Sequence, residues 1–470
     1  MAPPCEGRSA GPKSWTMPAF LLDHAFLPSG FARDVRVEVE DGLVTAVQPG
    51  QPAGGAERLA GIALPGMPNL HSHAFQRGMA GLAERRGPAN DTFWTWREVM
   101  YRFLGRLSPE DVEAIAAFAY AEMLEGGYTL VGEFHYLHHD PAGQPYSDIA
   151  ELSGRIAAAA SETGIGLTLL PCFYAQGGFG GRPPVEGQRR FINDLDSFAR
   201  LLEGARRHLG RVPGARMGVA PHSLRAVTPE ALEAVADLVP EGPIHIHAAE
   251  QWLEVEDCVA WSGRRPVEWL LENAGLDERW CLIHATHMTA DETARLAESG
   301  AAAGLCPLTE ASLGDGTFEG PRFLRSGGAF GIGTDSNIQI DAAAELRQLE
   351  YSQRLAHRGR NLMTLDEGES TGRRLFTSAL AGGAQAMAQP MGAIAPGQRA
   401  DFVVLDAGHP ALAAAGPESW LDCWIFCAGQ SLVKDVVAGG RHVVTNGRHH
   451  RREEIAACYR ASLARVVGET

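Results

Sequence analysis

Two histidines spaced two residues apart, His71 and His73, follow an apolar run in the segment LPGMPNLHSHAF. Side chains two apart on an extended segment point the same way, so both rings can reach one metal ion. An ordinary solvated pair of histidines explains this motif, taken alone, at least as well. The motif therefore indicates a metal site only if further ligands lie close to these two histidines.

Three more potential ligands each end a short apolar run of the same kind. His247 ends IHIH, His284 ends CLIH and Asp335 ends GIGTD. Glu250 follows His247 by three residues, where a carboxylate can lie beside an ion without binding it and can transfer protons as a general acid or base. The alternative for Glu250 is an acidic residue favoured by the dipole at the start of a helix.

The apolar runs alternate with helical stretches, which indicates buried parallel strands joined by helices. Seven such runs lie at 130–134, 166–172, 217–222, 244–247, 282–285, 301–306 and 329–333. With the run at 62–64 they make eight strands, the number that a (β/α)8 barrel needs. The active sites of such barrels lie where the C-terminal ends of the strands converge, and the five potential ligands all follow strand ends.

Both ends of the chain have a different pattern of apolar and polar residues, which is typical of β-strands. Residues 35–48 alternate apolar and polar side chains around Asp41-Gly42, and residues 436–444 repeat this pattern around Gly439-Gly440, which predicts two β-hairpins. The prediction is an α/β fold, a TIM-like barrel with a small β-sandwich domain built from both chain ends. The predicted parts are a disordered extension (1–16), the small domain (17–65 with 395–470) and the metal-dependent barrel (66–394).

Composition and charge limit the classes of partner. The chain has 470 residues and a formal net charge of −16, which disfavours nucleic acid and anionic membranes as main partners. No run approaches the ~18 apolar residues that span a membrane, and a cytoplasmic location is expected. Lys13 and Lys434 are the only lysines among 41 basic residues, which excludes a Walker-type phosphate loop and a Schiff-base lysine in the central part of the chain.

In their order along the chain, the HxH pair, the HxxE motif, the single histidine and the aspartate resemble the single-metal deaminase branch of the amidohydrolase superfamily. Within that branch, the chain most resembles the N-formimino-L-glutamate deiminases. Guanine and chlorotriazine hydrolases share the metal ligands, but the sequence segments expected to line their substrate pockets look different from those of this chain. The strings that carry this closer resemblance are HSHAFQRGMAG (71–81), TFWTWREVMY (92–101), GEFHYLHHDP (132–141), APHSLRAV (220–227), HIHAAEQ (245–251) and CPLTEASLGDG (306–316).

The resemblance implies hydrolytic deimination of N-formimino-L-glutamate to N-formyl-L-glutamate and ammonia in histidine degradation, and it implies a homodimer. Asp335 and His284 would orient the attacking water and take up its proton, and Glu250 would protonate the leaving nitrogen. The implied metal ligands are His71, His73, His247 and Asp335. The implied substrate contacts are Gln76, Arg97, Tyr136, His222 and Arg225.

Two-metal members of the superfamily bridge their ions with a carbamylated lysine on the fourth barrel strand. Here that strand reads MGVAPH and holds no lysine, so one divalent ion per chain is expected. Three histidines and a carboxylate favour Zn²⁺, and the ligand types leave Fe²⁺ and Mn²⁺ open. Without a bridging ligand for a second ion, His135, His138 and His139 are interpreted as loop histidines.

The implied pocket residues suit a substrate with two carboxylates, because a guanidinium binds a carboxylate through two parallel donors. Without the resemblance, a surface ion pair would be the better interpretation of Arg97. Two other functions stay open. A related single-metal deaminase acting on a purine, pterin or triazine would need aromatic stacking more than two arginines. A non-catalytic binding protein on the same fold would be expected to lose ligands that are all present here.

Overall fold

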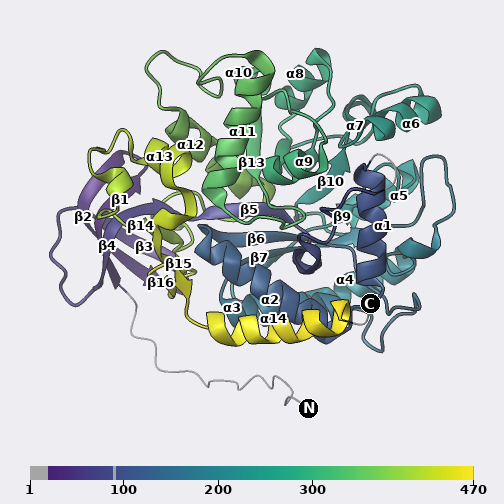
Figure 1. Ribbon diagram of the computed structural model, residues 1–470, viewed down its shortest axis with the longest axis horizontal. Coiled ribbons are helices and arrows are strands. Elements are labelled where there is room, and N and C mark those ends of the chain that lie inside the picture. Colours follow the sequence, from purple (N-terminus) through teal and green to yellow (C-terminus); the bar gives the residue numbers. More distant parts are fainter. Residues whose placement is uncertain (1–18, 88–90, 469–470) are drawn as a thin grey trace.

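The computed structural model describes residues 19–87 and 91–468, which form a barrel with a smaller sheet at one side (Figure 1). The extension predicted for residues 1–16 lies outside the described residues. The smaller sheet combines strands from both ends of the chain, and the barrel occupies the central part of the sequence. The predicted α/β class, with its barrel and small sheet domain, is confirmed.

Eight strand positions surround the barrel axis, and all their pairings are parallel. The strands are β5 (Met67–Ser72), β6 (Tyr128–His135), β7 (Gly166–Phe173), the split strand β8 (Arg216–Met217) and β9 (Ala220–Pro221), β10 (Ile244–Ala248), β11 (Trp280–His284), β12 (Ala302–Leu305) and β13 (Ala329–Ile332). Parallel bridges from Ser72 to Asp335 and from Val219 to Ile244 join the two arcs into a ring.

The assignment of the first barrel strand differs from the sequence prediction. Residues 62–64 belong to β4 (Glu57–Pro65), which pairs with β1 (Ala19–Leu27) and β14 (Phe402–Leu405) in the small sheet. The first barrel strand is β5, which starts only two residues after β4 ends. The C-terminal half of β4 and all of β5 are buried, so burial does not separate the two strands; the break at Pro65-Gly66 does.

Helices cover the outside of the ring, and two of them begin with a capping hydroxyl residue followed by proline. Ser108 caps α2 by accepting a hydrogen bond from the amide of Asp111, and Thr228 caps α5 in the same way. The helices of the barrel are α1 (Phe93–Leu104), α2 (Pro109–Glu125), α3 (Glu151–Thr163), α4 (Leu195–Leu209), α5 (Pro229–Asp237), α6 (Trp252–Ser262), α7 (Pro266–Asn273), α8 (Ala290–Glu298), α9 (Pro307–Leu313), α10 (Gly320–Arg325), α11 (Ala342–His357) and α12 (Thr371–Ala386). Short 3-10 turns follow β5 (Ala74–Met79) and precede α4 (Glu186–Gln188).

Hydrogen bonds join the small domain into one eight-stranded sheet, in the order β17-β16-β15-β14-β4-β1-β2-β3. Its apolar face packs around a separate core that includes Phe20, Val37 and Phe402. The hairpin predicted around Asp41-Gly42 is present, and both turn residues have positive φ. The strands not yet given are β2 (Gly30–Glu40), β3 (Leu43–Gln48), β15 (Val433–Ala438), β16 (Arg441–Thr445) and β17 (Arg448–His449).

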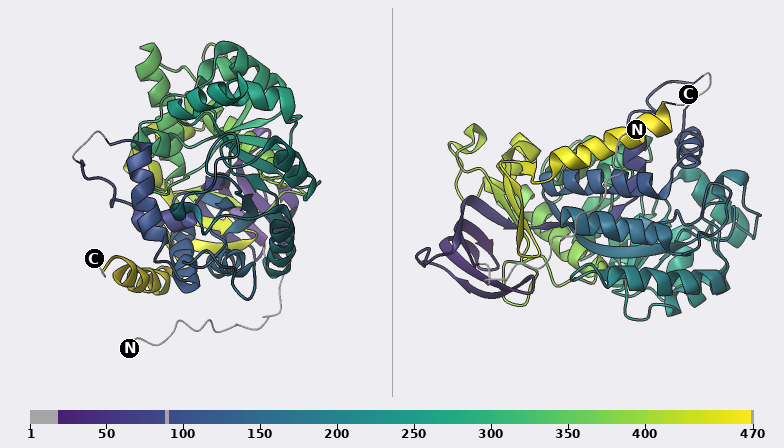
Figure 2. Two further views of the ribbon diagram at one scale, coloured as in Figure 1. Left: turned by 90° about the vertical axis from the view of Figure 1, so that its right-hand side faces the viewer. Right: turned by 90° about the horizontal axis from the view of Figure 1, so that it is seen from below.

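The C-terminal part of the chain also contacts the barrel. Helix α14 (Arg452–Val467) lies along α2, where the rings of Tyr459 and Phe118 stack at 4.0 Å (Figure 2). The apolar stretch at 420–428 folds into α13 (Trp420–Cys423) and a turn of π-helix (Trp424–Ala428) that pack into the core. The division of the chain into domains stays a prediction. Within the described residues, no helix is long and apolar enough to cross a membrane.

Candidate metal centre and substrate pocket

The fold brings the four predicted metal ligands together at the C-terminal end of the barrel. Asp335 Oδ1 lies 3.4 Å from His71 Nε2 and 3.2 Å from His73 Nε2. His247 Nε2 lies 3.2 Å from His71 Nε2, and the ligand atoms of all four residues lie within 4.8 Å of one another. All four side chains are buried, and together they offer four lone-pair atoms to a single point.

Hydrogen bonds on the far side of two rings fix which nitrogen faces the centre. His73 Nδ1 lies 2.9 Å from the carbonyl oxygen of Phe134, and His247 Nδ1 lies 2.9 Å from that of His222. Each Nδ1–H donates to its carbonyl, so the lone pair of each Nε2 points inward. Burial lowers the pKa of His71, His73 and His247, which favours the neutral imidazole that a metal requires.

A buried network of amide and hydroxyl groups joins the end of β5 to the segment that carries Asp335. Asn69 Nδ2 donates to Thr334 Oγ1 at 2.7 Å, and its Oδ1 accepts from the amide of Thr334 at 3.1 Å. Asn337 Nδ2 donates to Ser72 Oγ at 3.1 Å. Asp335 itself has a positive φ of 43°, a strained conformation of the kind found at functional sites. The network holds that strained residue against the histidine pair.

His284 and Glu250 lie beside the metal ligands. His284 Nε2 is 3.8 Å from Glu250 Oε1 and 3.8 Å from Asp335 Oδ2. Burial raises the pKa of Glu250 to about 7, so its carboxyl group can both hold and release a proton near neutral pH. Although burial alone would lower it, the charge of Glu250 and its neighbours raises the pKa of His284 to about 10.

A second group of close ligand atoms, His284, Cys306 and Asp335, overlaps the first because it shares Asp335. Burial raises the pKa of the Cys306 thiol well above its usual range, which disfavours the thiolate that a metal would need. The two groups therefore overlap and do not describe two separate sites.

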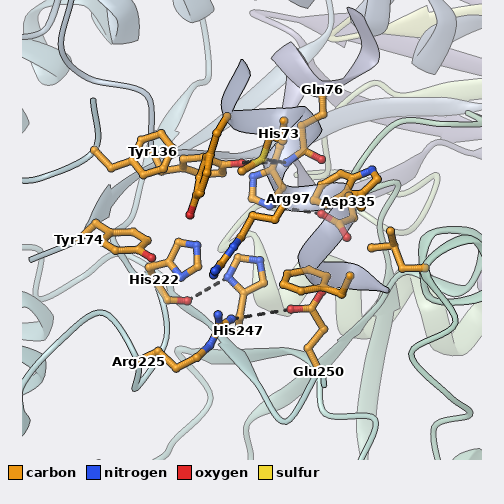
Figure 3. Close-up of a pocket in the computed structure, with 16 residues that line it drawn as sticks. His73, Gln76, Arg97, Tyr136, Tyr174, His222, Arg225, His247, Glu250 and Asp335 are labelled. Carbon is orange, nitrogen blue, oxygen red and sulfur yellow. Dashed lines mark hydrogen bonds and ion pairs between the residues drawn. The ribbon is translucent and has the colours of Figure 1, made fainter. Parts of the chain in front are cut away.

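A pocket opens beside the metal ligands, and all five predicted substrate contacts line it (Figure 3). Gln76 donates to the hydroxyl of Tyr136 at 2.8 Å, which fixes both side chains. The ring of His222 packs 4.8 Å from that of His247. Figure 3 shows Arg97 and Arg225 on the same side of the pocket, facing the metal ligands.

The two arginines have few partners within the protein. Arg225 Nη2 lies 3.9 Å from Glu250 Oε2, and its Nε lies 4.0 Å from Glu254 Oε2, both too long for direct hydrogen bonds. The guanidinium of Arg97 stacks on Trp94, with 4.4 Å from its central carbon to the ring centroid. In the described part of the chain, Nε of each arginine is buried without a hydrogen-bond partner. Both groups can therefore bind an anion.

Several residues of the site were not predicted from the sequence. Glu254 accepts from the amides of Ala249 and Glu250, each at 3.2 Å, and so fixes the turn that carries Glu250. Glu310 accepts from His284, and Trp94 stacks on Arg97. Trp94 and Glu310 lie in the strings TFWTWREVMY and CPLTEASLGDG, but a string does not tell which of its residues faces the site; Glu254 lies outside every such string.

The neighbouring histidines take structural positions. His138 Nε2 lies 2.8 Å from the carbonyl oxygen of Cys172, and His139 Nε2 lies 2.8 Å from that of Ile192. His135 is the last residue of β6 and is buried, so it lies in a strand and not in a loop. Among the described residues, the close groups of potential ligands include none of the three.

Two family models match the chain. Residues 62–443 match the model described as "Amidohydrolase family", and residues 22–61 match "Formimidoylglutamate deiminase HutF, N-terminal domain". A protein of Pseudomonas aeruginosa named formimidoylglutamate deiminase is 53% identical over 455 residues, which cover 96% of this chain and 99% of that protein.

Solved structures agree with the fold. The crystal structure of an amidohydrolase from Brucella melitensis has a TM-score of 0.91 at 53% identity, covering 96% of this chain and 100% of that one. An adenosine deaminase from Xanthomonas campestris with bound zinc has a TM-score of 0.79 at 22% identity, covering 96% and 99%. At this lower identity the likeness concerns the fold alone.

Proposed function

The chain belongs to the amidohydrolase family, and from this premise we propose that it hydrolyses N-formimino-L-glutamate to N-formyl-L-glutamate and ammonia in histidine degradation. The relative that is 53% identical along almost its whole length is named for this deimination. The observation that carries the proposal is the pocket itself, in which two arginines and Glu250 lie with His73, His247 and Asp335, three of the four proposed metal ligands (Figure 3).

The four ligands His71, His73, His247 and Asp335 fit a divalent ion, and zinc is the ion that we propose. The neutral state of the histidines, the inward lone pairs and the one carboxylate match the ligand preference of Zn²⁺. An ion held there supplies a Lewis acid that lowers the pKa of water from about 15.7 to about 7.

The protein groups around this centre are placed to move the protons of the reaction. Hydrolysis adds water to the formimino carbon and then breaks the bond from that carbon to the terminal nitrogen. Asp335 lies where it can accept the proton of the attacking water, and so does His284 whenever its Nε2 carries no proton. Glu250 lies beside His284 and can give protons to the nitrogen, which leaves as ammonia.

The two carboxylates of the substrate are proposed to bind the two arginines. A carboxylate placed between Arg97 and Arg225 would meet donors whose charge is only partly balanced by Glu250 and Glu254. Gln76 and Tyr136, which bond to each other, would contact the formimino group or its neighbouring carboxylate, together with His222.

One observation favours a second candidate, a deaminase that acts on a purine, pterin or triazine. The pocket wall contains aromatic side chains on which a planar ring could stack: Phe93, Trp96, Tyr101, Tyr136, Tyr174 and Phe191. Trp94 is already stacked on Arg97, however, and an uncharged heterocycle would offer no acceptor charge to the Nε of either arginine, which is buried without a hydrogen-bond partner among the described residues. The dicarboxylate therefore remains the better substrate.

Release of ammonia from a panel of substrates tests the proposal. The zinc-loaded protein is assayed with formimino-glutamate, formimino-aspartate, formimino-glycine, guanine and cytosine. We expect the highest kcat/KM for formimino-glutamate, and a loss of about tenfold or more for formimino-glycine, which lacks one carboxylate. Faster turnover of guanine or cytosine would contradict the proposal and support the second candidate.

The resemblance also implies a homodimer and a cytoplasmic location, and both stay predictions. The apolar stretch at 420–428 is packed into the core of one chain. Light scattering of the purified protein measures its mass, and a value of twice the mass of one chain is the expected result.

A further inference from the structure

Glu310 is a buried carboxylate that contacts His284 on the side away from the metal ligands. Its Oε1 lies 3.2 Å from His284 Nδ1, and the same oxygen accepts a hydrogen bond from the amide of Cys306 at 2.8 Å. Glu310 is 5% exposed, and it lies in α9, which follows β12. Its contact with the ring joins two neighbouring barrel strands at the level of the site.

The opposite nitrogen of the ring makes no hydrogen bond within the described part of the chain. His284 Nε2 is buried without a hydrogen bond among the described residues, and it lies at equal distances of 3.8 Å from Glu250 Oε1 and Asp335 Oδ2. These distances exceed a direct hydrogen bond, and an oxygen atom to one side of either pair could lie within hydrogen-bond distance of both groups. Nε2 is therefore aimed at the place where the attacking water must be.

A neutral histidine carries its one proton on either nitrogen, and the hydrogen bond made by one nitrogen decides the state of the other. A carboxylate accepts hydrogen bonds, so the ring offers its Nδ1–H to Glu310. The amide of Cys306 points at the same oxygen, which keeps that oxygen an acceptor. In both the neutral and the charged imidazole, Nδ1 is then protonated.

We propose that Glu310 is a positioning residue that holds the proton on Nδ1 of His284 and leaves Nε2 as the atom that exchanges a proton with the substrate water. This inference rests on the proposed function, since it assigns a role in that hydrolysis. In this proposal Nδ1 of His284 orients the ring through its bond to Glu310, and Nε2 transfers the proton.

The competing interpretation is that Glu310 only caps its helix. The bond from the Cys306 amide is a cap of this kind, because Cys306 precedes the first residue of α9. Glu345 is a matched control for this interpretation. It is fully buried on α11 and accepts from the amide of Leu308 at 2.8 Å, so it holds the same short helix. None of the hydrogen bonds and ion pairs found for Glu345 among the described residues involves His284.

Three variants of the full chain separate these roles: Glu310→Leu, Glu310→Gln and Glu345→Leu. Glu310→Leu removes the acceptor, and we expect kcat for formimino-glutamate to fall about 10²-fold with KM and zinc content unchanged, the scale of a positioned acid or base. Glu310→Gln keeps an acceptor oxygen in place and should stay within about tenfold of the parent. Glu345→Leu should lower the melting temperature and keep kcat.

Nitrogen NMR of histidine-labelled, zinc-loaded protein gives a readout that does not depend on activity. The Nδ1 signal of His284, assigned by its loss in His284→Asn, is expected at the shift of a protonated nitrogen in the parent and in Glu310→Gln. In Glu310→Leu it should move toward the shift of an unprotonated nitrogen.

The proposal is overturned if folded, zinc-loaded Glu310→Leu keeps kcat within about threefold of the parent, or if Glu345→Leu loses kcat equally. An unprotonated Nδ1 in the parent protein overturns it as well. A parent protein that is inactive on formimino-glutamate would contradict the proposed function instead, and the Nδ1 signal would still decide the role of Glu310.

Discussion

The guanidinium of Arg225 lies 3.9 Å from the carboxylate of Glu250, Nη2 to Oε2. A group suited to bind the charge of a substrate is thus adjacent to a group suited to transfer protons. Glu254 contacts both residues. It accepts a hydrogen bond from the amide of Glu250, and its Oε2 lies 4.0 Å from Arg225 Nε. Binding and proton transfer therefore share one buried support, and separate substitutions should distinguish them.

Loss of one ligand should release the metal ion. We expect the purified protein to hold one equivalent of zinc per chain, and His73→Ala or Asp335→Ala to lose most of it, because each contributes one of four clustered ligand atoms. Elemental analysis measures the content, and His138→Ala, a buried histidine outside the cluster, is the control. Two equivalents per chain without added metal would contradict a single-ion site.

Replacement of Glu250 by Gln should separate metal binding from proton transfer. Glu250 is outside the ligand cluster, so zinc should remain, while kcat should fall about 10²-fold or more because the amide cannot give up a proton in the same way. Steady-state kinetics and zinc analysis test this together. Gln251→Glu offers a neighbouring control. Activity near that of the parent would mean that another group moves the protons.

Arg225 should determine the preference for an anionic substrate. Arg225→Met should keep zinc and lower kcat/KM for formimino-glutamate by at least about tenfold, since a charge-assisted hydrogen bond contributes about 1.5–3 kcal/mol. Arg225→Lys should recover only part of the loss, because lysine lacks the two-donor fork.

A substrate analogue serves as the control for Arg225. If the carboxylate that it binds is replaced by an amide, the loss caused by Arg225→Met should shrink, because the partner charge is already gone. Equal losses for the acid and the amide would show that Arg225 holds the loop and not the substrate.

Arg190 should act on substrate binding from outside the pocket. Its buried guanidinium donates to the carbonyl oxygens of Leu104 and Leu107, at the end of the helix that carries Arg97. Arg190→Met should raise KM about tenfold, on the scale of one lost charged hydrogen bond, with zinc unchanged. Arg189→Met, an exposed neighbour bonded to Pro141, should leave KM as it was. If KM is the same in both variants, Arg190 does not help to position the helix that carries Arg97.

Much of the site follows from residue types and order. The HxH pair, His247, His284 and Asp335 could be placed together because each follows an apolar run, and the ends of parallel strands converge in a barrel. The structure confirms this convergence. The absence of lysine between Lys13 and Lys434 excluded a carbamate bridge without any knowledge of the fold.

The first barrel strand was predicted wrongly from the sequence. The run at 62–64 and the strand β5 are both fully buried, one in the small sheet and the other in the barrel. Periodicity reports burial and does not report which sheet provides it. The pairing of β4 with β1 and β14 depends on segments from both ends of the chain, which no local pattern contains.

Residue identity and order alone were enough to predict the chemistry of the site, namely the candidate ligand set, a single ion and the candidate acid and base. The tertiary structure decided how these groups are held. Asn69 bonds to Thr334 across 265 residues, Glu310 meets His284, and Glu254 supports both Arg225 and Glu250. Such contacts depend on the direction of each side chain and on the packing of distant segments. These follow from the whole fold, because a buried polar group takes whichever partner the surrounding elements bring within reach.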